Sequence, residues 1–257
     1  MVTSYPLPEG FTEIEVFGIG TTLLIEALLG FVLNGLTIAS FYKIRELRTP
    51  SNLLIISLAV ADTGLCINAF VAAFSSFLRY WPYGSDGCQI HGFQGFVAAL
   101  SSISSCAAIA WDRYHQYCTR SKLHWSTSIS VVMFVWGFSA FWSMMPLFGW
   151  GEYDYEPLRT CCTLDYSKAD RNFISYLFPL AFFEYLIPLF IMITAYQSIH
   201  QKLKKSGQLK MPAVLAKMSP AVNAYVYGLG NENYRGGIWQ FLTGQKIEKT
   251  ETDNKAN

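Results

Sequence analysis

Charged residues are scarce in this chain: they make up 14% of its 257 residues, against 52% hydrophobic residues, and the net charge is +1. This composition excludes an ordinary soluble enzyme and is typical of a membrane protein. No long basic block is present, so the electrostatic signature of nucleic-acid binding is missing and no nucleic-acid partner is expected. None of the six cysteines has the spacing of a zinc site, so no metal is predicted.

Apolar stretches of about 20 residues, the length needed to cross a bilayer, recur along the chain. They cover residues 16–42, 53–77, 88–117, 129–150 and 173–199, with a weaker sixth at 211–230. Lysine and arginine gather after the first, third and fifth stretches, which places these loops in the cytoplasm and the N-terminus outside. The acidic residues 1–15 lack the basic start of a secretory signal and are expected to form an extracellular N-terminus.

Lys217 is the lone cationic residue of the sixth stretch. A charge inside a membrane segment is costly unless it is paired, neutralised or used covalently, so Lys217 is a candidate functional residue. A buried neutral lysine can condense with an aldehyde, releasing water and forming a Schiff base. The alternative is a lysine whose side chain extends to the membrane interface.

Several motifs fall on these stretches in a characteristic order. They are Asn34, Asp62 at the end of LAVAD, Cys88, the triplet Asp112, Arg113 and Tyr114, Trp136, Pro188, Tyr196, and Asn223 with Tyr227 in NAYVY. Together they resemble the rhodopsin-like G-protein-coupled receptors, and the stretches AAIAWDRYHQYC and CCTLDYSKADRNF resemble the retinochrome-like retinal receptors among the opsins. The resemblance implies an all-α, rhodopsin-like helical bundle over residues 16–230, with six of the seven spans, followed by a short amphipathic helix and polar tail in 231–257.

The resemblance also implies a function. An intact relative is expected to bind all-trans-retinal through the lysine that matches Lys217 and to convert it in light to the 11-cis form for the visual cycle. The protein orients the polyene, and the photon supplies the energy. The expected setting is an intracellular membrane, similar to the endoplasmic reticulum, in retinal support cells. The expected partners are retinal, the lipid bilayer, a G protein and other proteins of the opsin cycle.

Three residues are candidates for the anion that stabilises a protonated Schiff base. His91 stands in the third-helix place where visual pigments have a carboxylate. Glu156, six residues before Cys162, matches the loop glutamate of the family. Glu184 is a further acid inside the fifth stretch. The alternatives are a packing histidine, a solvated loop acid and a protonated buried acid, respectively.

The resemblance implies a disulfide between Cys88 and Cys162, with Cys161 as the less favoured partner. Cys66 and Cys106 lie inside apolar stretches and are expected to be small apolar fillers.

The triplet Asp112, Arg113 and Tyr114 closes the third stretch and, by resemblance, holds an ion-pair latch and faces a G protein. Ala224 stands in NAYVY where the family usually has proline, which removes a kink device of the seventh helix and speaks against efficient signalling.

The sequence lacks a recognisable sixth helix. Residues 200–216 begin with the basic HQKLKKSGQLK and contain no Trp-x-Pro motif, so the chain reads as a shortened isoform in which the sixth helix is missing between about residues 200 and 211. A crossing by residues 211–230 would then carry the basic tail outside, against the charge rule. We therefore expect weakened or absent retinal binding. The alternatives are a signalling receptor for another ligand and a non-pigment splice isoform that is retained or pairs with the full-length receptor.

Overall fold

The computed structural model describes residues 11–167 and 170–206. This part of the chain contains five helical rods that are long and apolar enough to cross a membrane: Glu13–Lys43, Pro50–Leu78, Gly84–Thr119, Trp125–Phe148 and Arg171–Lys205. The first five predicted spans are therefore confirmed. The sixth predicted span, at 211–230, and the predicted C-terminal helix lie outside the described residues.

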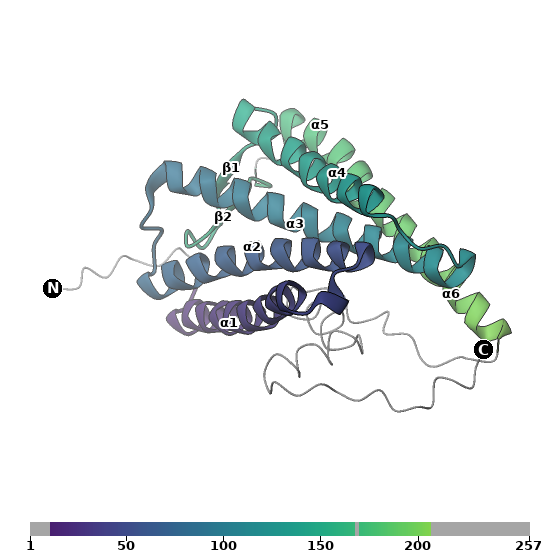
Figure 1. Ribbon diagram of the computed structural model, residues 1–257. Helices are drawn as coiled ribbons and strands as arrows, with labels where there is room; N and C mark the ends of the chain where they lie inside the picture. The colour runs from purple at the N-terminus through teal and green to yellow at the C-terminus, as the bar shows by residue number, and fades with distance from the viewer. Residues whose placement is uncertain (1–10, 168–169, 207–257) are drawn as a thin grey trace.

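Figure 1 shows the order of the elements along the chain. They are α1 (Glu13–Lys43), η1 (Arg45–Leu47), α2 (Pro50–Leu78), α3 (Gly84–Tyr114), η2 (His115–Thr119), α4 (Trp125–Met144), η3 (Met145–Phe148), β1 (Tyr153–Tyr155), β2 (Cys162–Leu164), α5 (Arg171–Leu180), η4 (Ala181–Leu186) and α6 (Ile187–Lys205). The last three form one continuous rod, so α6 is the inner part of the fifth membrane helix and not a sixth crossing.

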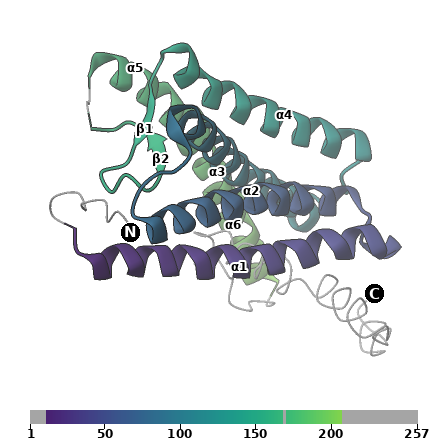
Figure 2. The same cartoon turned by 90° about the vertical axis from the view of Figure 1, so that its left-hand side faces the viewer.

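Helix α3 is the centre of the described bundle. It packs against α2 on one side and against α4 and α6 on the other, while α1 packs on α2. Figures 1 and 2 show α1, α2 and α3 side by side, with α4 and the fifth rod beyond them. The helix that touches most neighbours therefore runs through the middle of the predicted bundle.

Local sequence signals fix the helix ends. Thr12 and Glu15 form a reciprocal capping box, so α1 begins three residues before the apolar stretch that predicted it. Asp170 accepts a hydrogen bond from the backbone N–H of Phe173 and caps the fifth rod. That rod continues to Lys205, six residues beyond its predicted end, as a polar extension past the apolar stretch.

The predicted all-α fold class is confirmed, and the structure adds one short β-hairpin to it. The outer loop between the fourth and fifth rods folds into a two-stranded antiparallel hairpin in which Tyr153 pairs with Leu164 and Tyr155 with Cys162. Pairing satisfies backbone groups that the loop would otherwise bury against the bundle. Figure 1 shows the hairpin beside the outer end of α3.

Small polar side chains join the helices inside the bundle. The Trp136 indole N–H donates to Ser57 Oγ at 3.0 Å, and Ser57 Oγ lies 3.2 Å from Ser105 Oγ. Ser102 Oγ donates to Asp62 Oδ1 at 2.7 Å. Hydrogen bonds of this kind contribute to helix association in membranes, where burial of apolar surface drives little. They fix α2, α3 and α4 relative to one another.

Candidate functional site

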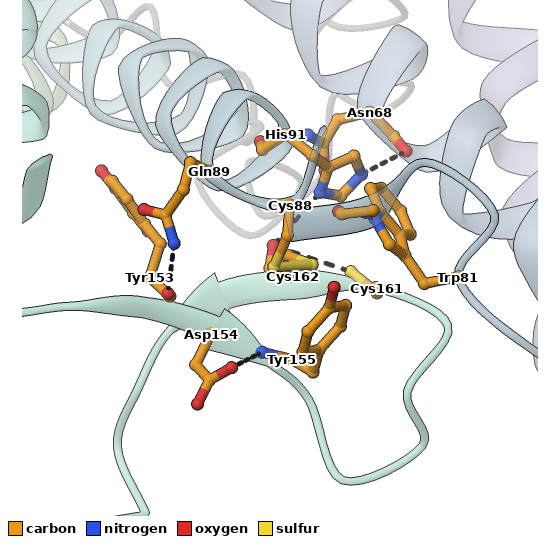
Figure 3. The surroundings of a disulfide bond; sticks show 11 residues. Asn68, Trp81, Cys88, Gln89, His91, Tyr153, Asp154, Tyr155, Cys161 and Cys162 are labelled. Atoms are coloured by element: carbon orange, nitrogen blue, oxygen red, sulfur yellow. Dashed lines mark hydrogen bonds between the residues drawn. A yellow bond between two sulfur atoms is a disulfide. The ribbon is translucent and has the colours of Figure 1, made fainter. Parts of the chain in front are cut away.

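A disulfide and a histidine join the hairpin to the outer end of α3 (Figure 3). Cys88 and Cys162 form the predicted bridge, whereas Cys161 is a free cysteine. The His91 ring lies one turn further along α3, with Nδ1 3.2 Å from the Cys162 carbonyl and Nε2 3.3 Å from the Asn68 carbonyl. A neutral imidazole has one N–H, so it donates to one of these oxygens at a time.

The structure shows His91 in the packing role that was one of its two predicted alternatives. Trp81 meets the imidazole edge-on, with ring centroids 4.9 Å apart, and His91 is buried. Glu156 of the hairpin is close enough to interact with it electrostatically. Two of the three sequence candidates for the anion site thus lie together at the outer end of the bundle.

Tyr153 joins the hairpin to α3 and α4. Its backbone carbonyl accepts from Gln89 Nε2 at 2.9 Å, and its hydroxyl donates to the Ser143 carbonyl of α4 at 2.8 Å. Burial raises the pKa of the Tyr153 phenol, so the hydroxyl stays a donor at neutral pH. Gly92 permits this approach, because a Cβ there would lie 2.7 Å from the Tyr153 ring.

Glu156 lies at the start of the hairpin loop and is half-buried. Its backbone N–H donates to the Cys161 carbonyl at 3.0 Å, and its carbonyl accepts from the Arg159 N–H at 2.8 Å. Burial, with the nearby Glu156 charge as a second cause, raises the pKa of the Cys161 thiol to about 12. Glu156 is thus held in a tight turn against the bundle and is not a freely solvated loop acid.

An aromatic shell lies between α3, α4, the hairpin and the fifth rod. Its buried centre comprises Leu100, Trp142, Leu164, Tyr176 and Leu180, with Phe96, Phe138, Met145, Trp150 and Phe173 packed around it. The Tyr176 hydroxyl donates to the Trp142 carbonyl at 2.9 Å. A shell of this kind offers flat, apolar contact surface with few polar groups.

Glu184 lies in the π-helical segment η4 of the fifth rod. It is 1% exposed, and its Oε2 accepts a hydrogen bond from Ser104 Oγ of α3 at 3.0 Å. Its Oε1 has no hydrogen-bond partner among the described residues. A π-helical turn with a buried acid is a common sign of a functional position, and the segment departs from a regular α-helix between Pro179 and Pro188.

Sequence reasoning missed one membrane carboxylate. Glu26 of α1 lines a cavity of about 570 Å³ between α1, α2 and the hairpin, together with Asn68 and Glu156. The available signal was a single acid in the middle of the first apolar stretch, a position where an ionisable residue is functional by default.

The inner triplet is hydrogen-bonded differently from the expected latch. Asp112 accepts from Ser51 Oγ at 2.9 Å and from Gln116 Nε2 at 2.8 Å, while the Arg113 guanidinium donates to Gln116 Oε1 at 3.0 Å. Gln116 therefore stands between the acid and the arginine, and Tyr114 ends α3 beside them. Within the described ranges the structure has one ion pair, and it does not involve this triplet.

Lys217, Asn223 and Tyr227 lie outside the described residues, so the structure does not test them. Cys66 and Cys106 are buried free cysteines, as expected for apolar fillers. Across residues 11–167 and 170–206, no group of three histidine, cysteine or acidic side chains could hold a metal ion.

Five membrane helices with α3 at their centre, and a disulfide-bound hairpin over the outer end, define a receptor of the rhodopsin class. The chain matches the family described as 7 transmembrane receptor (rhodopsin family) over residues 33–227. It also resembles the crystal structure of squid rhodopsin, with a TM-score of 0.72 and 28% identity over 77% of this chain and 55% of that one. The chain therefore belongs to the rhodopsin family and is an integral, multi-pass membrane protein.

Within that family the similarity extends to particular relatives. The chain is 54% identical to the RPE-retinal G protein-coupled receptor of Homo sapiens, over 98% of this chain and 100% of the relative. It is 30% identical to the rhodopsin of Enteroctopus dofleini over 82% of this chain and 47% of that protein. The alignment with the human receptor spans 290 positions, more than the 257 residues here, so part of that receptor has no counterpart in this chain.

Proposed function

We propose that this chain is a retinal-binding opsin in which Lys217 is the attachment point and the aromatic shell contributes to the surroundings of the polyene. The observation that carries the proposal is the similarity to the human RPE-retinal G protein-coupled receptor over almost the entire chain. The described residues fit a long apolar ligand, because Trp142, Tyr176 and their neighbours provide aromatic contact surface.

The proposed reaction is the light-driven conversion of all-trans-retinal to the 11-cis form. Retinal supplies the photochemistry, and the protein restricts which bond can twist. The described residues would exclude water at the outer end, where the bridge between Cys88 and Cys162 holds the hairpin over the bundle. Glu156 and His91 would set the electrostatics there, and Glu184 would place a third polar group deeper along the fifth rod.

We further propose that the chain is a shortened form and that the positions missing from the alignment are the sixth helix and its outer loop. The fifth rod ends at Lys205, so the chain from there to Met211 spans at most about 20 Å when extended. This is shorter than the apolar core of a bilayer, about 30 Å. The link therefore cannot return to the outer side, and Lys217 would start from the inner side. Retinal binding should be weakened.

The test is covalent trapping. The purified chain and the human relative are incubated with all-trans-retinal, reduced with borohydride and digested, and the retinyl adduct is located by mass spectrometry. The expected result is a small adduct yield on Lys217 that is absent in Lys217→Ala and unchanged in Lys210→Ala. Complete failure to modify Lys217, under conditions that modify the human protein, would reject the pigment proposal.

Two further measurements separate the alternatives. Extraction of retinal after illumination shows whether the 11-cis isomer forms, which a signalling receptor for another ligand would not produce. Co-purification with a tagged full-length relative identifies a form that pairs with an intact receptor. Protease protection of a C-terminal tag then shows on which side of the membrane residues 245–257 lie. The proposed setting is an intracellular membrane of retinal support cells, which immunolocalisation would test.

A further inference from the structure

A basic pocket of about 640 Å³ lies at the inner end of the bundle. Its described walls come from the start of α2, the end of α3, the π-helical segment η2 and the loop that follows η2. The start of α2 and the inner end of α3 lie at the same end of the bundle as the end of α6 (Figure 1). The loops at this end are those that the charge pattern predicts to be cytoplasmic.

Positive charge converges on this pocket from two segments of the chain. Arg113 of α3 lines it together with Arg120 and Lys122, while the described lining residues include one acid, Glu46. The first turn of α2 forms part of the same wall, and the N-terminus of a helix adds partial positive charge. The pocket is therefore suited to an anion.

The backbone after η2 turns so that three consecutive residues reach the pocket. Arg120 ends η2 in the left-handed conformation, with φ 54°, and the Ser121 N–H donates to the His115 carbonyl at 3.3 Å. Arg120, Ser121 and Lys122 all line the pocket as a result. An arginine thus occupies a position whose backbone favours glycine, which points to a use for its side chain.

Hydrogen bonds hold the two walls in place. Gln116 Nε2 donates to Ser51 Oγ at 2.8 Å, which joins η2 to the start of α2, and Ser51 Oγ donates to Asp112 Oδ1 at 2.9 Å. Lys202 Nζ donates to the Cys118 carbonyl at 2.8 Å and ties η2 to the fifth rod. A ligand therefore meets walls that are already ordered, which lowers the entropy cost of binding.

Aromatic residues indicate the depth of the pocket in the membrane. Tyr117 lines it and is exposed, and the exposed Trp125 begins α4 shortly after Leu123, another lining residue. Tyrosine and tryptophan are enriched at membrane–water interfaces. The pocket is thus expected at the level of the lipid headgroups, where a lipid can reach it while its acyl chains stay in the bilayer.

We propose that this pocket binds the phosphorylated headgroup of an anionic lipid of the inner leaflet, with Arg120 and Lys122 pairing with its phosphates. Arginine binds phosphate through two parallel hydrogen bonds, and basic pockets between membrane helices on the cytoplasmic side suit phosphoinositide headgroups. This site goes beyond the proposed function, because it lies at the end of the bundle opposite the hairpin and does not include Lys217.

The experiment compares lipids that differ in their phosphate groups. The purified chain is titrated in detergent with dioctanoyl phosphatidylinositol 4,5-bisphosphate or dioctanoyl phosphatidylinositol, and native mass spectrometry counts the lipid-bound chains. We expect the bisphosphate to bind at least about tenfold more tightly, which corresponds to about 1.4 kcal/mol. Equal affinities would overturn the proposal and leave the pocket to an acidic segment of a partner protein. Soluble inositol 1,4,5-trisphosphate should compete weakly, and competition as strong as that of the lipid would overturn the assignment to a membrane lipid.

Arg120→Gly is the sharpest variant, because it removes the guanidinium at a backbone position that glycine adopts readily. It should weaken binding of the bisphosphate at least about fivefold and leave binding of phosphatidylinositol nearly unchanged. Arg79→Gly is the matched control: Arg79 is also left-handed, with φ 67°, and lies at the outer end of α2. Equal effects of the two variants would overturn the role of Arg120.

Lys122→Gln tests the second cation independently. It should also weaken binding of the bisphosphate at least about fivefold, whereas Lys205→Gln, at the exposed inner end of the fifth rod and outside the pocket, should leave it unchanged. Equal losses in both variants would mean diffuse attraction to a basic surface and would overturn the site. Failure to trap retinal on Lys217, together with an intact preference for the bisphosphate, would reject the retinal proposal alone.

Discussion

The contact between Ser104 and Glu184 predicts an unusual order of stability among variants. Ser104 is the one group that satisfies Glu184 among the described residues, and the second oxygen of this carboxyl has no partner there. Ser104→Ala leaves this buried acid without a hydrogen bond from the described residues. Glu184→Met removes the acid and keeps an unbranched side chain of similar length, which the site should accommodate.

The two substitutions should change the free energy of unfolding by different amounts, because they leave different polar groups buried. A buried polar group that loses its partner costs about 1–3 kcal/mol, so Ser104→Ala should destabilise the chain by that amount. After Glu184→Met, Ser104 Oγ can donate to the Leu100 carbonyl of its own helix, as serines in helices often do. This variant should therefore be neutral or more stable than the parent. The double variant should resemble Glu184→Met.

Thermal unfolding of the purified chain in detergent provides the measurement. For a chain of this size, about 1 kcal/mol corresponds to roughly 2–4 °C, so a loss of about 1–3 kcal/mol means that Ser104→Ala should melt about 2–12 °C below the parent. The coupling between the two sites follows from the double-mutant cycle and should favour the pair by about 1–3 kcal/mol. If Ser104→Ala melted at the same temperature as the parent, Ser104 would have no role in satisfying Glu184 and this prediction would be wrong.

Two further predictions concern the outer half of the bundle. Gly92→Ala should lower the free energy of unfolding by about 1–3 kcal/mol, because the added Cβ would lie 2.7 Å from the Tyr153 ring. Gly137→Ala in α4, where the added Cβ has nothing within 4 Å, should raise the free energy of unfolding by about 0.5–1 kcal/mol. Equal melting temperatures of the two variants would contradict this. In chains with a single free cysteine, Cys161 should react with maleimide much more slowly than Cys118 at pH 7.5, because the pKa of Cys161 is raised to about 12. The reaction rate of Cys161 should rise about tenfold per pH unit as its thiolate fraction grows. Comparable rates of the two cysteines at pH 7.5 would contradict the pKa shift.

The first five membrane spans could be predicted from the sequence because the apolar length of a segment is a property that is local along the chain. Their orientation, predicted from lysine and arginine in the alternate loops, stays a prediction. The bridge between Cys88 and Cys162 followed from the resemblance to the family and is present in the structure. Helix ends were less accurate, because a capping residue such as Thr12 or a polar extension such as that ending at Lys205 lies outside the apolar stretch.

The candidate site could be predicted only in part, because its geometry depends on contacts between distant segments. The sequence placed His91 and Glu156 on separate elements, and the folding of the hairpin onto α3 brings them close enough to interact electrostatically. No sequence motif indicates that Gln116 lies between Asp112 and Arg113. The contacts form because Gln116 lies one helical turn beyond these two residues. No family motif marks Glu26, so its position at a cavity beside α2 and the hairpin became visible only in the folded structure.

The contacts that join the hairpin to the outer end of α3 affect how the chain folds during its synthesis. Cys88 and Cys162 are joined, Gln89 holds Tyr153, and Tyr153 reaches α4, all before residue 165 is passed. Domains often fold during synthesis from the N-terminal side, so these connections can close while the ribosome is still adding residues. An early assembly that needs nothing downstream would let a splice variant with an altered C-terminal third pass its first steps of biogenesis as readily as a complete receptor does.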